Sequence, residues 1–488
     1  MIKRLYGVIF ILGIAVSSGA QTLTLDSCRA LAIANNKELR ISNEKINSAR
    51  YQHKAAKTNY LPKLYGEAGY LRNQRETQLL NDDQKSALVS MGTKTGATVQ
   101  QFATALATQY PALAPLISSL GTTYLPTVVS GLNGLGTSVV DAFRTDTRNI
   151  YTGALTLIQP IFMGGKIRAY DKITNYAEQL ATQQHETGMQ EVILSVDQAY
   201  WQVISLVNKK KLAESYLKLL NTLDHDISRM IANGFATKAD GLSVKVKVNE
   251  AEMTLTKVDD GLSLSKMLLC QLCGLNLTSP IHLADEDIDN LSVSPAKAEF
   301  DMKTAYDNRP ELKSLELATK IYDERVNVVK ADYLPQISLM GNYLVSNPSV
   351  YNGFEKKFKG AWSVGVMLKV PIWNWGEGMN KIRQAKSEAL ITRYQMSDAR
   401  EKIELQVNQS AFKVNEALKR YTMAKKNMEK ADENLRYANV GFKEGVIPAS
   451  NVLEAHTAWV QAQSDKIDSE VDIKLTNVTL QKSLGTLR

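Results

Sequence analysis

The chain contains 488 residues, with 58 Lys and Arg against 50 Asp and Glu, so its formal net charge is +8. This excess is small and forms no basic block of the kind that would suggest binding of nucleic acid. The three cysteines make an odd number and argue against a disulfide framework.

The N-terminus is typical of a secretory signal peptide at residues 1–20. Lys3 and Arg4 precede an apolar run over residues 5–16, and small residues at 18–20 precede Gln21. Cleavage lowers the net charge from +8 to +6 and leaves Gln21 rather than a cysteine at the new end, so we expect no lipid anchor there. Beyond residue 20 we find no run of about 18 apolar residues, and we expect no transmembrane helix in the mature chain.

The chain contains an internal duplication. Residues 57–62 (KTNYLP) recur as 330–335 (KADYLP) at an offset of 273, and residues 160–161 recur as 371–372 at an offset of 211. The difference of 62 residues places one long insertion in the first copy. The expected segments are a first repeat over 21–278, a linker or equatorial segment over 279–299 and a second repeat over 300–488.

Each repeat is predicted to contain a long helical hairpin. Long stretches in both halves lack proline and are rich in Ala, Lys, Glu, Gln and Leu, which favour helix. Helices over 166–232 and 379–440 would be about 100 and 93 Å long at 1.5 Å per residue. Their apolar residues recur in steps of three and four, which indicates coiled-coil packing. The tips are expected at 233–237 and 443–448, with helices returning to about 272 and 484.

Four segments alternate between apolar and polar or small side chains over nine or ten residues, as transmembrane β-strands do. They are expected at about 63–71, 151–159, 336–345 and 361–370. The insertion, residues 72–150, joins the first two strands and is expected outside the cell. Within it, residues 84–109 have helical character and residues 121–136 are expected to form a loop. We interpret the insertion as a passive loop, with a lid or surface decoration as the alternative.

Aromatic residues occur at both ends of these strands. They indicate either an interfacial belt of a membrane barrel or a helix–sheet junction in a soluble domain, and the signal peptide and alternating strands favour the belt. They are Tyr60, Phe162, Tyr333, Trp373 and Trp375 where helix meets strand, and Tyr151 and Trp362 at the far end.

Four strands are too few to close a membrane barrel. An open sheet edge in lipid leaves backbone N–H and C=O groups unsatisfied, each at a cost of several kcal/mol. Small membrane barrels begin at about eight strands. At least two copies of the chain must therefore share one barrel.

The chain resembles the TolC-type outer-membrane efflux family over about residues 23–488. The resemblance lies in the duplicated Tyr-Leu-Pro before a strand, in Leu-x-x-Pro-Ile-aromatic at 157–162 and 368–373, and in the tip sequence around 445–455. It implies a mainly α fold with transmembrane β: a homotrimer whose copies share a twelve-stranded β-barrel and an α-barrel of helical hairpins.

The resemblance also implies a location and partners. The location is the outer membrane of a Gram-negative bacterium, with a long periplasmic extension. The partners are outer-membrane lipid, a periplasmic adaptor (membrane fusion protein) and an inner-membrane transporter. The implied activity is passive, gated export of small molecules or proteins in tripartite efflux or type I secretion.

In the resembled family, acidic residues just after the second tip line the periplasmic constriction. Here these positions are Asn451 and Glu454, so one acid is replaced by a neutral amide. A ring of Glu454 carboxylates would tune permeation. The alternative is that Glu454 is a solvated charge at the start of a helix, where its interaction with the helix dipole is favourable. Asp240, the first-copy counterpart of Asn451, matches a capping box with Thr237. The expected adaptor contacts are Asn233, Gly234, Phe235, Lys443, Gly445 and Pro448.

No residue set indicates catalysis, a metal or a cofactor. The five histidines show no metal-ligand spacing. Cys270-x-x-Cys273 lacks a second pair, so we interpret it as buried core rather than a metal half-site or redox pair. A non-conducting periplasmic coiled-coil scaffold is the alternative to a channel, but a scaffold has no use for four alternating strands. An envelope hydrolase would need a pocket constellation that the sequence lacks.

Overall fold

The computed structural model describes residues 21–76, 78–287 and 300–488. The expected signal peptide and residues 288–299 of the expected linker lie outside the described residues. The chain divides into two compact units. The first comprises Met1–Lys54, Ala169–Val326 and Lys381–Arg488, and the second comprises Ala55–Arg168 and Asn327–Asn380.

Long helices form most of the first unit and confirm the predicted hairpins. α7 (Lys166–Ala232) is followed by α8 (Lys238–Cys273), and α11 (Glu377–Lys443) is followed by α12 (Ala449–Ser483). α7 and α11 each contain 67 residues, and their first and last residues both differ by 211. The sequence duplication is thus repeated in the bounds of the helices.

Shorter elements precede each long hairpin. α1 (Leu25–Asn35) and α2 (Lys37–Lys57) belong to the first copy, and α9 (Met302–Asn308) and α10 (Pro310–Ala331) to the second. β1 (Gln21–Leu23) pairs in parallel with β4 (Ile281–Leu283). The sequence did not predict this pair, which ties the start of the described chain to the segment between the repeats.

All three cysteines lie in the main core of the first unit. Cys28 on α1 and Cys270 and Cys273 on α8 are free thiols that are at most 1% exposed. Sγ of Cys273 lies 3.6 Å from the backbone oxygen of Cys28, and burial raises the pKa of the Cys270 thiol. The interpretation of Cys270 and Cys273 as buried core residues is confirmed, and the fold brings Cys28 to them.

A buried ion pair joins α1 to α7. Nε and Nη2 of Arg29 donate to the two carboxylate oxygens of Asp197 at 2.7 and 2.5 Å, and Asp197 is fully buried. The hydrogen bond to Asp197 raises the pKa of Arg29. Because a buried carboxylate without a partner is strongly unfavourable, Asp197 depends on α1 being in place.

Next to the tips, α7, α8, α11 and α12 share a second core. Its buried side chains are Leu220, Leu223, Ile227, Val244, Ala251, Ala438, Ala449, Val452, Leu453 and Ala455. His456 of α12 is 2% exposed, and its ring centroid lies 6.5 Å from that of Tyr216 on α7. Burial lowers the pKa of His456 to about 4, and its Nδ1 has no hydrogen-bond partner among the described residues.

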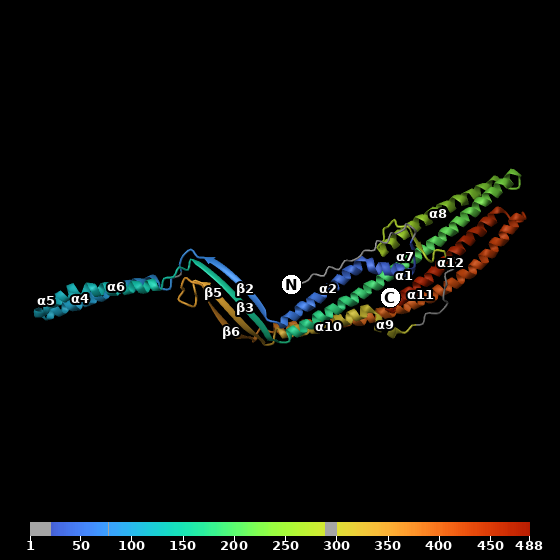
Figure 1. The fold of residues 1–488 in the computed structure, drawn as a ribbon. Coiled ribbons are helices and arrows are strands. Elements are labelled where there is room, and N and C mark those ends of the chain that lie inside the picture. Colours follow the sequence, from blue (N-terminus) through green and yellow to red (C-terminus); the bar gives the residue numbers. More distant parts are fainter. Residues whose placement is uncertain (1–20, 77, 288–299) are drawn as a thin grey trace, which may run out of the picture. The chain divides into compact units, whose positions relative to one another are not determined.

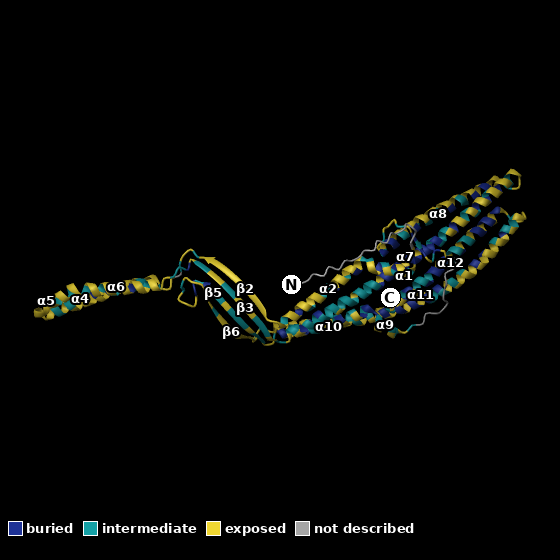
Figure 2. Cartoon of the chain, viewed as in Figure 1, coloured by how far each residue is buried: buried dark blue, intermediate teal, exposed yellow. Residues whose placement is uncertain are grey.

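The second unit contains a four-stranded antiparallel sheet. β2 (Lys63–Arg72), β3 (Asn149–Met163), β5 (Gln336–Asn347) and β6 (Lys359–Lys369) lie side by side in the order β2-β3-β5-β6 (Figure 1). The four predicted strands are confirmed, and β3 extends beyond its expected range at both ends. Every residue of β2 is exposed, as are all but one of β6 (Figure 2), so the edge strands expose both faces.

The insertion between β2 and β3 is helical along most of its length. Its elements are α3 (Asp82–Val89), α4 (Met91–Gln109), the short 3-10 helix η2 (Pro111–Leu113), α5 (Ala114–Thr123) and α6 (Leu125–Ala142). The helical character expected for residues 84–109 is confirmed, but the loop expected for residues 121–136 is wrong. The glycines there suggested a turn, yet Gly136 lies within α6, where an added Cβ would collide with the backbone of Leu88. Glycine here permits close helix packing rather than a turn.

The expectation of no membrane-spanning helix in the mature chain stays a prediction, with one segment to set beside it. By length and composition alone, Pro111–Ala142 is long and apolar enough to cross a membrane. Its apolar residues are interrupted by Gly, Ser and Thr, so a search for an unbroken apolar run misses it.

Arg29→Met is expected to destabilise the protein by about 3–5 kcal/mol, because Asp197 is left charged, buried and unpaired. The double variant Arg29→Met/Asp197→Leu removes both charges and should recover most of this loss. Thermal unfolding in detergent, followed by circular dichroism, compares the variants. Equal destabilisation by the single and double variants would contradict this account.

His456 should make the stability of the tip core depend on pH. Its pKa is about 4 in the folded chain against an ordinary 6.5, so between these values the unfolded chain binds a proton that the folded chain does not. Stability is therefore expected to fall as the pH is lowered from about 6.5 towards 4. His456→Phe should flatten this part of the dependence of the unfolding midpoint on pH. An unchanged slope would assign the effect to other groups.

Candidate functional site

The register of the sheet brings large apolar residues of all four strands together on one face, because residues paired directly across strands share a face. One row of paired residues is Leu64, Leu157, Gly341 and Val364, and the next is Gly66, Leu155, Tyr343 and Trp362. The opposite face carries rows that are more polar: Tyr65, Thr156, Asn342 and Ser363, and Gly69, Thr152, Ser346 and Lys359. Trp362 and Val364 on the apolar face are 76% and 72% exposed. One face is therefore suited to lipid and the other to water.

The sheet has two open edges. β2 and β6 are each hydrogen-bonded to one neighbouring strand within the described chain. Their outer N–H and C=O groups thus have no strand partner among the described residues. In water such an edge invites pairing with another chain, and in lipid it must be paired.

The predicted interface aromatics lie in exposed positions near the strand ends. Trp373 and Trp375, which follow β6, are 74% and 88% exposed, and their ring centroids are 5.9 Å apart. Near the other end of the sheet, the ring of Tyr151 lies 5.0 Å from Tyr70 and 6.0 Å from Phe358. Tyr60 and Phe162 are also exposed, whereas Tyr333 is half-buried. Their role as a membrane belt stays a prediction.

Both tips of the helical hairpins have the same backbone geometry. Gly234 and Gly445 have φ values of +80° and +72°, a region that glycine enters without strain. In each tip the next N–H donates to the carbonyl five residues back at 2.8 Å, Phe235 to Met230 and Val446 to Gly441. This bond defines the Schellman end of a helix. Phe235 and Val446 are 79% and 77% exposed, so each tip presents an apolar side chain to solvent.

Val446 lies within the tip expected at 443–448 and follows Gly445 as Phe235 follows Gly234. The predicted capping box is confirmed. The N–H of Thr237 donates to Asp240 Oδ2 at 2.9 Å, and the N–H of Asp240 donates to Thr237 Oγ1 at 3.2 Å. The hydrogen bonds from Thr237 lower the pKa of Asp240.

Asn451 and Glu454 lie three residues apart in the first turns of α12 and are both exposed. Between and after them Val452, Leu453 and Ala455 are buried in the tip core. Among the described residues, neither Asn451 nor Glu454 takes part in an ion pair. The packing of α12 therefore leaves both predicted gate residues on a solvent-facing side of the helix.

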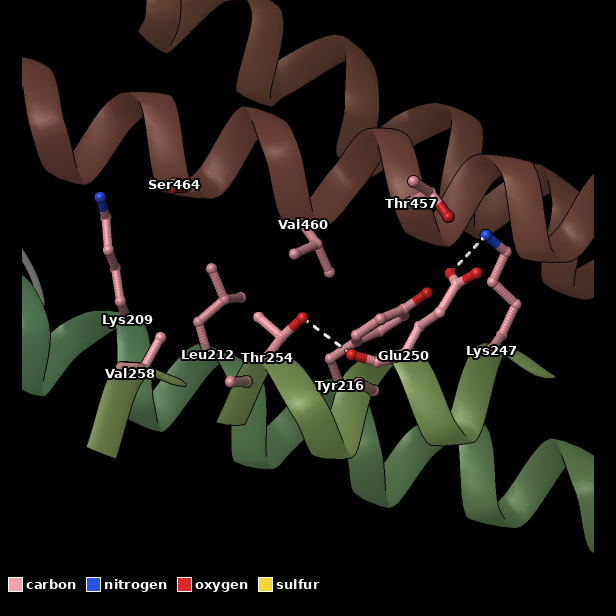
Figure 3. Close-up of a pocket in the computed structure, with 12 residues that line it drawn as sticks. Lys209, Leu212, Tyr216, Lys247, Glu250, Thr254, Val258, Thr457, Val460 and Ser464 are labelled. Atoms are coloured by element: carbon pink, nitrogen blue, oxygen red, sulfur yellow. Dashed lines mark hydrogen bonds and ion pairs between the residues drawn. The ribbon is translucent and has the colours of Figure 1, made fainter. Parts of the chain in front are cut away.

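A cavity of about 220 Å³ lies between α7, α8 and α12 (Figure 3). Nζ of Lys247 forms an ion pair with Glu250 at 2.7 Å, and Oγ1 of Thr254 donates to the backbone oxygen of Glu250 at 2.8 Å. These polar groups are satisfied within α8 and do not converge on a reaction centre. Over the described residues, no group of three or more His, Cys, Asp or Glu side chains could hold a metal ion.

Comparison with known proteins relates the chain to outer-membrane export proteins. Residues 302–486 match the model of the outer membrane efflux protein family. The alkaline protease secretion protein AprF of Pseudomonas aeruginosa is 25% identical over 288 residues, 56% of this chain and 58% of AprF. The outer membrane protein TolC of Escherichia coli is 20% identical over 351 residues, 70% of each chain. The matched stretch thus spans little more than half the length of AprF.

Solved structures share the fold along nearly the whole chain. A membrane protein from Pseudomonas aeruginosa superposes with a TM-score of 0.73 at 16% identity, covering 94% of this chain and 93% of that one. The outer membrane protein VceC from Vibrio cholerae gives a TM-score of 0.70 at 13% identity, covering 94% of this chain and 96% of that one. Residues 302–486 thus match the outer membrane efflux protein family, and nearly the whole chain has the fold of solved outer-membrane proteins of Gram-negative bacteria, to which it is similar.

Proposed function

We propose that this chain is the outer-membrane channel of a tripartite efflux or type I secretion system. It acts as a passive gated duct that carries small molecules or proteins to the exterior. The sheet with one apolar face, one more polar face and two open edges carries this proposal. A non-conducting periplasmic scaffold would place an exposed apolar face and two open edges in water, which is unfavourable.

The strand directions support closure of the sheet between copies. β2, β3, β5 and β6 are successively antiparallel, so β6 runs opposite to β2. β6 of one copy can therefore pair with β2 of the next and continue the same antiparallel pattern around a barrel. Three copies would supply twelve strands, the number that resemblance to the TolC type implies.

The exposed tips support docking to a periplasmic adaptor, which in turn binds an inner-membrane transporter. Phe235 and Val446 expose apolar side chains at equivalent positions of the two hairpins. Such side chains favour burial against a partner. Asn233, Gly234, Lys443, Gly445 and Pro448 belong to the same two tips and are proposed as contacts with them.

We assign Asn451 and Glu454 to the periplasmic constriction. Both are exposed in the first turns of α12, and rotation about a common axis would repeat each of them once per copy. The Glu454 carboxylates would then form a ring whose field favours cations. The amide of Asn451 leaves this ring with half the charge of a doubly acidic one.

Detergent extracts of the outer membrane should contain heat-resistant oligomers of this chain. The purified oligomer should form pores in planar bilayers, and their conductance should be low if the periplasmic end rests closed. A soluble periplasmic monomer, or an oligomer that forms no pore, would overturn the proposed duct.

Glu454→Gln should weaken cation preference and block by multivalent cations, because it removes the carboxylate ring. Glu454→Asp keeps the charge and serves as the matched control, and Asn451→Asp should strengthen the block by adding a second ring. Single-channel recordings measure all three variants. If selectivity and block are the same in all of them, Glu454 does not line the passage.

A further inference from the structure

The insertion ends in a long uncharged helical hairpin. Residues 95–140, a stretch of 46, contain no Asp, Glu, Lys, Arg or His. Charges gather instead at the base of the insertion, where Asp146 accepts hydrogen bonds from Arg148 at 2.8 Å and from Lys356 at 3.1 Å. The base is closed by a bond of 2.7 Å from the N–H of Asn73 to the backbone oxygen of Arg148. The uncharged stretch, residues 95–140, comprises most of α4, together with η2, α5 and most of α6.

The two arms of the hairpin pack closely through small residues. A Cβ added at Gly92 or Gly96 of α4 would collide with Val129 of α6. Asn133 of α6 donates to Oγ1 of Thr93 at 2.9 Å and accepts from its N–H at 3.2 Å. The glycines and this polar pair thus hold the arms together. Larger apolar side chains of α5 and α6 lie away from this contact with α4.

These large side chains follow the helical repeat and stay exposed. We name them the α5–α6 face: Leu116 (60% exposed), Leu120 (51%), Tyr124 (63%), Val128 (54%), Leu135 (61%) and Val139 (39%). They are spaced by four or seven residues and therefore lie along one side of the helices. A contiguous exposed apolar surface of this kind marks an interaction site.

The connectivity of the sheet indicates what covers the α5–α6 face. The hairpin follows β2 in the chain. β2 is an edge strand, and its outer side has no strand partner among the described residues. Pairing of β2 with a neighbouring copy therefore holds the hairpins of the copies near one another and raises their effective concentration. Identical faces that carry no charge meet without like-charge repulsion.

A lipid surface is a poorer partner for this hairpin. Helices that lie on membranes carry Lys and Arg on their polar side, and residues 95–140 contain neither. A hairpin that crosses a membrane needs two apolar arms, but α4 carries many Thr and Gln residues. Only Pro111–Ala142 among the described helices meets the length and composition of a span.

We infer that the α5–α6 face binds the same face of neighbouring copies, so that the insertions form a helical bundle outside the barrel. This inference rests on the proposed assembly of copies into one channel. It assigns the insertion a partner, namely further copies of this chain, in place of the passive loop expected from the sequence.

Cysteine cross-linking in cells tests the inference. Leu135→Cys places a thiol on the α5–α6 face, and Gln101→Cys places one on the exposed side of α4, half a turn from Gly92. The native Cys28, Cys270 and Cys273 are buried and should not react. A short bis-maleimide should link Leu135→Cys into dimers of the chain on denaturing gels and leave Gln101→Cys unlinked. Adding Leu116→Asp and Val128→Asp to Leu135→Cys should abolish the cross-link, because each buries an unpaired charge.

The heat-resistant oligomer is measured on the same samples without cross-linker. A stable oligomer without a cross-link at Leu135, or with equal cross-linking at both positions, overturns the bundle and leaves the channel standing. Absence of any oligomer overturns the channel and the bundle together.

Discussion

The two open edges of the β2-β3-β5-β6 sheet are the constraint on which the proposed assembly depends. A backbone group left unpaired in lipid costs several kcal/mol, so a four-stranded sheet cannot persist alone in a membrane. β6 and β2 have the directions needed to pair between copies. If they do, copies must share a barrel, their helical hairpins surround one axis, and the insertions beside β2 come together. The proposed ring of Glu454 carboxylates and the proposed bundle thus both follow from edge pairing.

Within one chain, the duplication builds matching parts that differ at a few positions. α7 and α11 have the same length, and both tips end in a Schellman turn with an exposed apolar side chain. The departures are local: Asp240 completes a cap in the first copy, whereas its counterpart Asn451 stands beside the exposed Glu454. The helical insertion also occurs in one copy only, at an edge strand. We therefore propose that the two departures from the duplication, at Asn451 and Glu454 and at the insertion, are where the channel is controlled.

Much of the fold could be predicted because its signals are local. Missing prolines and helix-forming residues predict α7 and α11, and strict alternation predicts the four strands. The loop expected over residues 121–136 was wrong because glycine has two uses: it permits positive φ, as at Gly234, and it permits close helix packing, as at Gly136. The sequence around Gly136 does not distinguish them, since the second use depends on Leu88, 48 residues earlier.

The sequence by itself determined the long helices, the four strands of the main sheet and the resemblance to a family, because hydrogen bonds within helices and alternation along strands depend on near neighbours. Only the tertiary structure decided which strand faces coincide, since a register shift of one residue would move an apolar row to the other face. It also decided what is hidden and what is exposed: His456 and Cys28 are buried, whereas the α5–α6 face stays in solvent. These outcomes depend on contacts between residues far apart in the chain.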